Sequence, residues 1–231
     1  MDSRVGALLL SLVLGCLGSA QAEEDYFPLT VGTTWDYELT IKRGEKSHSI
    51  RYSTEAVRKE ALDGVECVVF ETRSGSKLLS TSWYAREGSV VREWQSSTQG
   101  GALVQKLREV VAEEEGAEEP EPERGRVLLD AAKREPGTSW AWSSAEGDAS
   151  GTVTVLGTTE LTTPALGKLT CLQIEERGEF RRGDKTAQQV RTLWFAPQLG
   201  LVREVSKITL PSGGETTSEA MLLARPKAET Q

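Results

Sequence analysis

The sequence predicts an exported, all-β protein built mainly from antiparallel strands, and three observations lead to that prediction. The chain begins with a leader peptide, its short apolar runs are separated by turn residues, and four of its segments occur twice in the same order. We expect two similar curved sheets or half-barrels from an internal duplication, with room for one short helix near the middle of the chain.

The first 22 residues have the features of a secretory signal peptide. Arg4 precedes the apolar run 5–14, and small residues follow up to Ala22, which completes an Ala-x-Ala cleavage site. An apolar run of about ten residues is too short to cross a bilayer, which takes roughly twenty. We therefore predict export to the periplasm or the extracellular space, with cleavage after Ala22.

Cys16 offers a second way to process this leader. The sequence Val-Leu-Gly-Cys at 13–16 is similar to a bacterial lipobox, in which cleavage before the cysteine leaves its thiol to carry lipid. Free secretion and lipidation of Cys16 both remain open at this point. The mature protein would be held at a membrane only if Cys16 is lipidated.

Alternation of apolar and polar residues indicates strands in both halves of the chain. Trp35, Tyr37, Leu39 and Ile41 alternate with polar residues, which is typical of a strand with one buried face. The segment 151–162 is rich in Thr and Val, which favour strands. Two segments could be helical, 103–111 and 127–133. Turn residues separate the runs at 62–64 (LDG), 74–76 (SGS), 87–88 (EG), 182–184 (RGD) and 211–214 (PSGG).

Four pairs of similar segments indicate an internal duplication. Trp83 and Trp194 lie in one pair, Cys67 and Cys171 in another, and the separations are 111 and 104 residues. The seven extra residues of the second half fall most simply in 179–187, at a hairpin tip, where insertions are tolerated. The pairs are 31–35 with 136–140, 63–71 with 167–175, 81–85 with 192–196, and 91–93 with 202–204.

The duplication divides the mature chain into two β repeats joined by an acidic segment. That segment is dominated by glutamate and has no large apolar side chain, so it cannot bury enough surface to fold by itself. The expected organisation is a signal peptide at 1–22, a first repeat at 23–111, a flexible acidic linker at 112–126, a second repeat at 127–224 and a disordered tail at 225–231.

Three segments of the chain resemble a group of exported bacterial proteins and lipoproteins of unknown function. They are 26–37 (YFPLTVGTTWDY), 163–171 (TPALGKLTC) and 194–202 (WFAPQLGLV). The resemblance implies a curved antiparallel sheet, similar to the half-barrels of periplasmic lipoprotein carriers, and it implies no activity or ligand. The second half departs from the group because Pro136-Gly137 replaces the Phe-Pro-Leu opening.

The repeated tryptophans and cysteines have two possible roles each. Trp35, Trp83, Trp140 and Trp194 are either core residues or the lining of an apolar ligand groove shared by the two halves. Cys67 and Cys171 hold equivalent places, so in an oxidising compartment they could form a disulfide, or each could be a small buried residue.

Residues for catalysis are scarce, and we expect no enzymatic activity, metal or cofactor. The chain has one histidine, His48, in a polar stretch, and no phosphate-binding loop or nucleophile elbow. Its net charge of −8 argues against nucleic-acid binding. We predict a non-catalytic envelope protein that binds an apolar or lipidic ligand or a partner protein. The alternatives are a purely structural or assembly role, or a carboxylate-dependent hydrolase, for which Glu71 and Glu175 are the first pair to inspect.

Overall fold

The computed structural model describes residues 24–98, 126–143, 149–182 and 185–228, which form thirteen strands and no helix. The first half contains β1 (Thr33–Arg43), β2 (Lys46–Leu62), β3 (Val65–Ser74), β4 (Lys77–Glu87), β5 (Val90–Thr98) and β6 (Arg126–Asp130). The second half contains β7 (Ser139–Ser143), β8 (Ala149–Thr163), β9 (Gly167–Arg182), β10 (Lys185–Ala196), β11 (Gly200–Thr209), β12 (Glu215–Leu222) and β13 (Lys227–Ala228).

All of these strands belong to one antiparallel sheet. Each half is a six-stranded meander, and the two meanders join where β1 pairs with β12. The order across the sheet is β6-β5-β4-β3-β2-β1-β12-β11-β10-β9-β8-β7, and the short β13 pairs with the start of β1. The sheet therefore has two arms, β1–β6 and β7–β12, connected along a central seam of hydrogen bonds.

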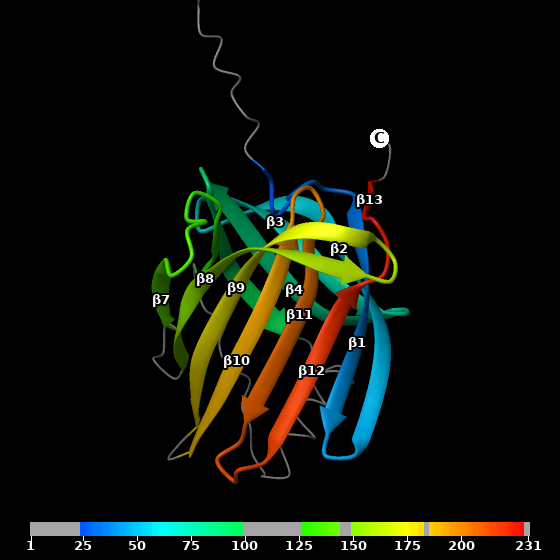
Figure 1. Ribbon diagram of the computed structural model, residues 1–231. Coiled ribbons are helices and arrows are strands. Elements are labelled where there is room, and N and C mark those ends of the chain that lie inside the picture. The colour runs from blue at the N-terminus through cyan, green and yellow to red at the C-terminus, as the bar shows by residue number, and fades with distance from the viewer. Residues whose placement is uncertain (1–23, 99–125, 144–148, 183–184, 229–231) are drawn as a thin grey trace, which may run out of the picture.

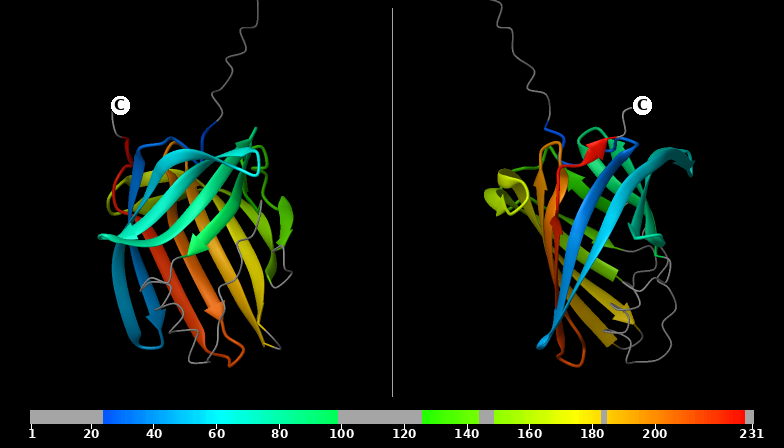
Figure 2. Two further views of the ribbon diagram at one scale, coloured as in Figure 1. Left: turned by 180° about the vertical axis from the view of Figure 1, so that it is seen from behind. Right: turned by 90° about the vertical axis from the view of Figure 1, so that its right-hand side faces the viewer.

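The sheet curls until its two arms face each other in a nearly closed, barrel-like shape. In Figure 1 the strands β10, β11 and β12 lie in front of β3 and β4, and the view from behind in Figure 2 shows the reverse order. The dark blue start of the described chain and β13, which contains its last residues, both lie at the upper end in Figure 1.

Apolar side chains from both arms meet inside the curl and form the core. One cluster joins Val91 and Leu129 of the first arm to Leu172, Leu193 and other residues of the second. A second cluster joins Trp35 and Phe70 to residues that include Cys171, Val202 and Leu222. Because both clusters contain residues of both arms, burial of apolar surface holds the arms together.

Local sequence explains the strands and their turns. Along β1 the buried residues are Trp35, Tyr37, Leu39 and Ile41, as the alternation predicts. The turn between β2 and β3 places Asp63 and Gly64 at φ angles of 52° and 82°, a left-handed conformation that Asp tolerates and Gly favours. The other predicted turns within the described residues also connect neighbouring strands.

The predicted fold class is confirmed: the described part is all-β and antiparallel, and its two arms are hydrogen-bonded into a single sheet. The duplication stays a prediction, although the paired cysteines lie on β3 and β9, the third strand of each meander. The hairpin β9–β10 is longer than β3–β4, at the place where the extra residues were expected.

Three boundary predictions need correction or lie outside the described residues. The segment 127–133 is not helical, because its first residues form β6, which pairs with β5 and so belongs to the first arm. Residues 227–228 are not part of a disordered tail, because they form β13 against Thr33 and Thr34. The acidic linker up to residue 125 and the possible helix 103–111 lie outside the described residues.

The end strands β6 and β7 are linked by side chains. No backbone hydrogen bond joins them within the described residues. Trp140 on β7 donates from its Nε1 to the carbonyl of Val127 on β6, at 3.1 Å. Arg126 of β6 reaches across to Glu176 on β9, and its guanidinium lies 4.4 Å from the ring centroid of Trp142 on β7. None of the described segments forms a helix that could cross a membrane.

Candidate functional site

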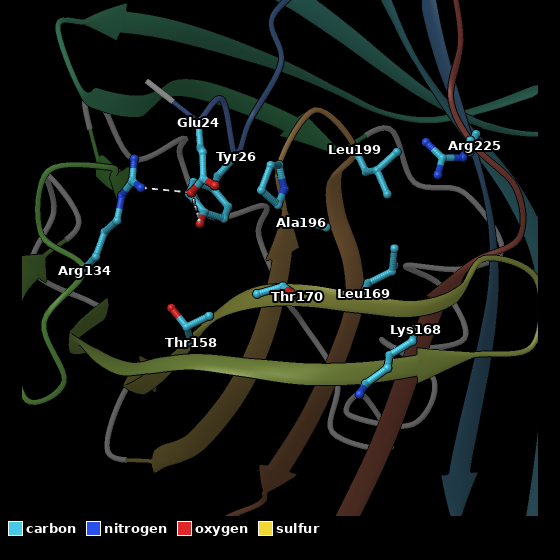
Figure 3. Close-up of a pocket in the computed structure, with 11 residues that line it drawn as sticks. Glu24, Tyr26, Arg134, Thr158, Lys168, Leu169, Thr170, Ala196, Leu199 and Arg225 are labelled. Atoms are coloured by element: carbon cyan, nitrogen blue, oxygen red, sulfur yellow. Dashed lines mark hydrogen bonds and ion pairs between the residues drawn. The ribbon is translucent and has the colours of Figure 1, made fainter. Parts of the chain in front are cut away.

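A cavity of about 410 Å³ opens near the end of the sheet where the described chain begins and ends. Its volume lies within the range of small-ligand sites, roughly 300–1,000 Å³. Figure 3 shows it above the β8–β9 ribbon, with contributions from five separate parts of the chain: the segment before β1, the loop before β7, the β8–β9 hairpin, the end of β10 with the following turn, and the segment between β12 and β13. The lining residues are Glu24, Tyr26, Arg134, Thr158, Lys168, Leu169, Thr170, Ala196, Pro197, Leu199 and Arg225.

One side of the cavity is fixed by contacts among its own lining residues. The Tyr26 hydroxyl donates to Oε2 of Glu24 at 2.7 Å, and Nη1 of Arg134 lies 3.0 Å from the same oxygen. The Arg134 guanidinium is 5.0 Å from the Tyr26 ring centroid, and its Nε donates to the carbonyl of Ala131. Burial, together with the Glu24 carboxylate, raises the pKa of Tyr26 to about 12, so this hydroxyl remains a donor at neutral pH.

The opposite side carries two further cations, Lys168 and Arg225, as Figure 3 shows. Lys168 lies at the start of β9, and its Nζ is 2.7 Å from Glu160 of β8, but both side chains are 65% exposed. Arg225 lies between β12 and β13 and has no ion-pair partner among the described residues. Apolar side chains of Leu169, Leu199 and Pro197 complete the lining.

A second polar constellation lies between the two arms, beside the core. Glu176 of β9 is paired with Arg126 of β6, and their side chains are only 4% and 10% exposed. Arg191 of β10 approaches Glu176 at 3.7 Å and Glu204 of β11 at 3.1 Å. Glu93 of β5 accepts a long hydrogen bond of 3.5 Å from the Tyr84 hydroxyl. We call these residues the inter-arm charge cluster: Tyr84, Glu93, Arg126, Glu176, Arg191 and Glu204.

The inter-arm charge cluster contains three carboxylates and two guanidinium groups. Burial raises the pKa of Glu93, and Glu176 adds to the rise, while Arg126, Arg191 and the Tyr84 hydroxyl oppose it. Burial also raises the pKa of Tyr84, with the Glu93 carboxylate contributing. Glu93 therefore holds a proton more readily than an exposed glutamate does.

Replacing Glu93 with Gln is expected to flatten part of the pH dependence of stability. A carboxyl group with a raised folded pKa binds its proton more tightly in the folded state. Its contribution to stability is therefore lost as the pH rises from its ordinary pKa of 4.5 through the folded value. Urea unfolding across this pH range should show a smaller loss of stability in Glu93→Gln than in the wild type.

Glu87→Gln is the matched control for Glu93, since Glu87 lies on β4 and is exposed beside Arg92. It should keep the pH profile of the wild type. Equal pH profiles for Glu93→Gln and the wild type would mean that Glu93 titrates normally.

The four tryptophans of the predicted groove do not come together at either cavity described in this structure. Trp35 is buried in the core, where its Nε1 donates to the carbonyl of Leu199 at 2.7 Å and its ring stacks on Phe70. A second cavity of about 330 Å³ lies beside Tyr37 and Tyr52 and is also lined by none of the four.

The other three rings lie in different surroundings. Trp140 bonds to the β6 backbone, and Trp194 lies under the guanidinium of Arg203 at 4.8 Å. Trp83 is partly buried, and its Nε1 has no hydrogen-bond partner among the described residues. The rings are thus distributed over the framework, and the expectation of one aromatic groove is not met by the described residues.

Of the two alternatives for the cysteines, the structure has the free thiols and not the disulfide. Cys67 and Cys171 are both free thiols and fully buried. Burial raises the pKa of Cys171 to about 11 and also raises that of Cys67, with a further contribution from Glu60. Both therefore stay protonated at neutral pH and act as small core residues. Cys16 and Ala22 lie outside the described residues.

The carboxylates singled out from the sequence are not the buried ones. Glu71 is paired with Arg73 at 2.6 Å, and Glu175 with Arg177 at 2.7 Å, both near the surface. Among the described acids of β9 the buried one is Glu176, which shares the inward parity of Leu172 and Ile174, so strict alternation along this strand could have identified it.

The repeated segments of the sequence could also have indicated two residues of the inter-arm charge cluster. The repeated Val-Arg-Glu segments contain Glu93 and Glu204, and their valines, Val91 and Val202, are buried. Because alternate residues share a face, each glutamate points to the side of its valine. His48 is exposed on β2, and no cluster of three or more metal-ligating side chains occurs within the described segments.

These observations define a class of structure: a strongly curled, thirteen-stranded antiparallel sheet with a small mixed cavity at one end. Among solved structures, the chain is similar to a protein from Bacteroides fragilis NCTC 9343, described as exported and as having a YmcC-like fold. That match has a TM-score of 0.50 and 14% identity over 87% of this chain and 98% of the other. At this identity the likeness shows the fold alone.

Two other solved structures show weaker likeness. A lipoprotein from Parabacteroides distasonis ATCC 8503 matches with a TM-score of 0.49 and 15% identity, over 87% of this chain and 98% of that one. The hypothetical lipoprotein YmcC from Escherichia coli K12 matches with a TM-score of 0.32 and 14% identity, over 85% and 86%. No protein-family model matches the chain. No curated protein matches it either.

Proposed function

We propose that this chain is a non-catalytic exported protein of the cell envelope that binds an amphipathic, lipid-like ligand in the cavity of Figure 3. The observation that carries the proposal is the mixed lining of that cavity. Leu169, Leu199 and Pro197 offer apolar contact, while charged side chains and the hydroxyls of Thr158 and Thr170 surround them. Sites of this kind bind ligands that have one apolar and one polar end.

The way the cavity is built also supports a binding role. The contacts among Glu24, Tyr26 and Arg134 hold one wall in place without a ligand. A wall that is already ordered loses little conformational entropy when a ligand binds, which favours affinity. The leader peptide supports export, and lipidation of Cys16 would place the protein at a membrane surface.

Native mass spectrometry of the protein purified from its own envelope tests the proposal. We expect a non-covalent adduct of lipid-like mass on the folded protein, which is lost on denaturation. The denatured mass in the same experiment distinguishes cleavage after Ala22 from lipidation at Cys16.

A variant with a filled cavity connects that adduct to the site. Thr170→Trp places a large ring at an exposed lining position and should abolish the adduct. Thr152→Trp, at an exposed position of β8 outside the lining, should retain it. A wild-type protein without adduct, or an equal adduct in both variants, would contradict binding in this cavity.

A carboxylate-dependent hydrolase is favoured by one observation only, the raised pKa of Glu93 beside Glu176. Neither residue lines either of the two cavities, and Arg126 and Arg191 already neutralise Glu176. The inter-arm charge cluster is better explained as a tie between the arms of the sheet.

A further inference from the structure

The charge balance of the cavity points to the chemistry of the ligand's polar end. Its lining contains three cationic side chains, Arg134, Lys168 and Arg225, and one carboxylate, Glu24. The excess of positive charge contrasts with the net charge of −8 for the whole chain. A concave site lined by one sign of charge concentrates ligands of the opposite sign.

The three cations are not equally available to a ligand. Arg134 is held by Glu24, by the Tyr26 ring and by the carbonyl of Ala131. The ion pair of Lys168 among the described residues is the exposed one with Glu160, and such surface pairs contribute about 0–1 kcal/mol. Arg225 has no ion-pair partner within the described segments, so Lys168 and Arg225 can turn to an incoming anion at little cost.

We propose that the cavity takes the anionic group of an amphipathic ligand, a phosphate ester or a carboxylate, which Lys168 and Arg225 contact directly. The hydroxyls of Thr158 and Thr170 lie along the same lining and can donate further hydrogen bonds to anion oxygens. Arginine binds such groups through two parallel N–H donors, and lysine adds a point charge. The apolar tail of the ligand then packs on Leu169 and Leu199. This inference rests on the proposed function and names its ligand class.

Isothermal titration calorimetry with three twelve-carbon amphiphiles, each below its micelle-forming concentration, tests the inference. The probes are dodecyl phosphate, dodecyltrimethylammonium and the nonionic tetraethylene glycol monododecyl ether. We expect dodecyl phosphate to bind at least about tenfold more tightly than the other two, since hydrogen bonds to charged groups are worth about 1.5–3 kcal/mol. Lys168→Gln and Arg225→Gln should each weaken dodecyl phosphate about tenfold and leave the nonionic probe unchanged.

Lys207→Gln is the matched control. Lys207 of β11 forms a similar exposed ion pair, with Glu215 of β12, and it does not line the cavity. It should bind all three probes as the wild type does. Equal affinity of the wild type for all three probes would overturn the inference while the proposed function survives. Failure of all three probes to bind would contradict the proposed function itself.

Two further experiments identify the source of the anion. Competition of inorganic phosphate with dodecyl phosphate supports a soluble phosphate compound as the ligand. Co-sedimentation with phosphatidylglycerol vesicles, but not with phosphatidylcholine vesicles, supports a lipid headgroup. In both experiments the competition or the co-sedimentation must be lost in Arg225→Gln. A signal that survives this substitution would count against the site.

Discussion

Replacing Glu176 with Gln is expected to lower the free energy of unfolding by about 3–5 kcal/mol. The substitution keeps the shape of the side chain and removes its charge. The guanidinium of Arg126, only 10% exposed, then loses its paired carboxylate, and Arg191 loses one of two. Removing one member of a buried ion pair is strongly destabilising, because the charge that stays buried loses much of its compensation. Urea denaturation followed by tryptophan fluorescence measures the change.

Glu175→Gln is the matched control, since it alters the adjacent residue on the opposite face of β9. Its partner Arg177 is exposed and the pair lies near the surface, so the expected change is below about 1 kcal/mol. The double substitution Arg126→Met with Glu176→Leu should recover much of the lost stability, because it removes both buried charges together. A cost below about 1 kcal/mol for Glu176→Gln would mean that water reaches the inter-arm charge cluster.

Replacing Trp35 with Ala is expected to cost about 3–5 kcal/mol. The ring is 4% exposed and stacks on Phe70 with centroids 5.5 Å apart, so its removal leaves a cavity in the core. Its Nε1 also satisfies the carbonyl of Leu199 in the turn between β10 and β11. The loss should appear as a lower urea midpoint with an unchanged slope.

Trp35→Phe separates the two contributions of this ring. Phenylalanine keeps most of the stacking and leaves the Leu199 carbonyl without its donor, for an expected cost of about 1–3 kcal/mol. Leu156→Ala, at a side chain that is 43% exposed, should change stability by less than about 0.5 kcal/mol. A Trp35→Ala protein as stable as Leu156→Ala would show that the ring is not part of the framework.

Much of the fold could be predicted because strand signals are local. The alternation at Trp35, Tyr37 and Leu39 and the Asp63-Gly64 turn each depend on neighbouring residues, and the structure agrees with both. The segment 127–133 was harder, since its short apolar stretch has no clear period. Its first residues form a strand because they pair with β5, which lies before the acidic segment in the sequence.

The candidate site could not be predicted from the sequence in the same way. Tyr26, Arg134, Lys168 and Arg225 belong to four stretches that meet only after the sheet has curled. No spacing rule connects them, and each reads as an ordinary surface residue in its own segment. Matching the repeats drew attention to the tryptophans, which the structure distributes over the framework.

The pairing of β1 with β12 has a consequence for how the protein matures. Partners such as Tyr37 and Leu222 are separated by almost the entire described chain, so the two meanders cannot join until β12 has been made. Closing so long a loop is slow, because the loss of chain entropy precedes the contacts that compensate for it. Until then the N-terminal meander has an open edge at β1. An open strand edge can pair with another chain, so this order of pairing leaves β1 available for wrong contacts until β12 has been made.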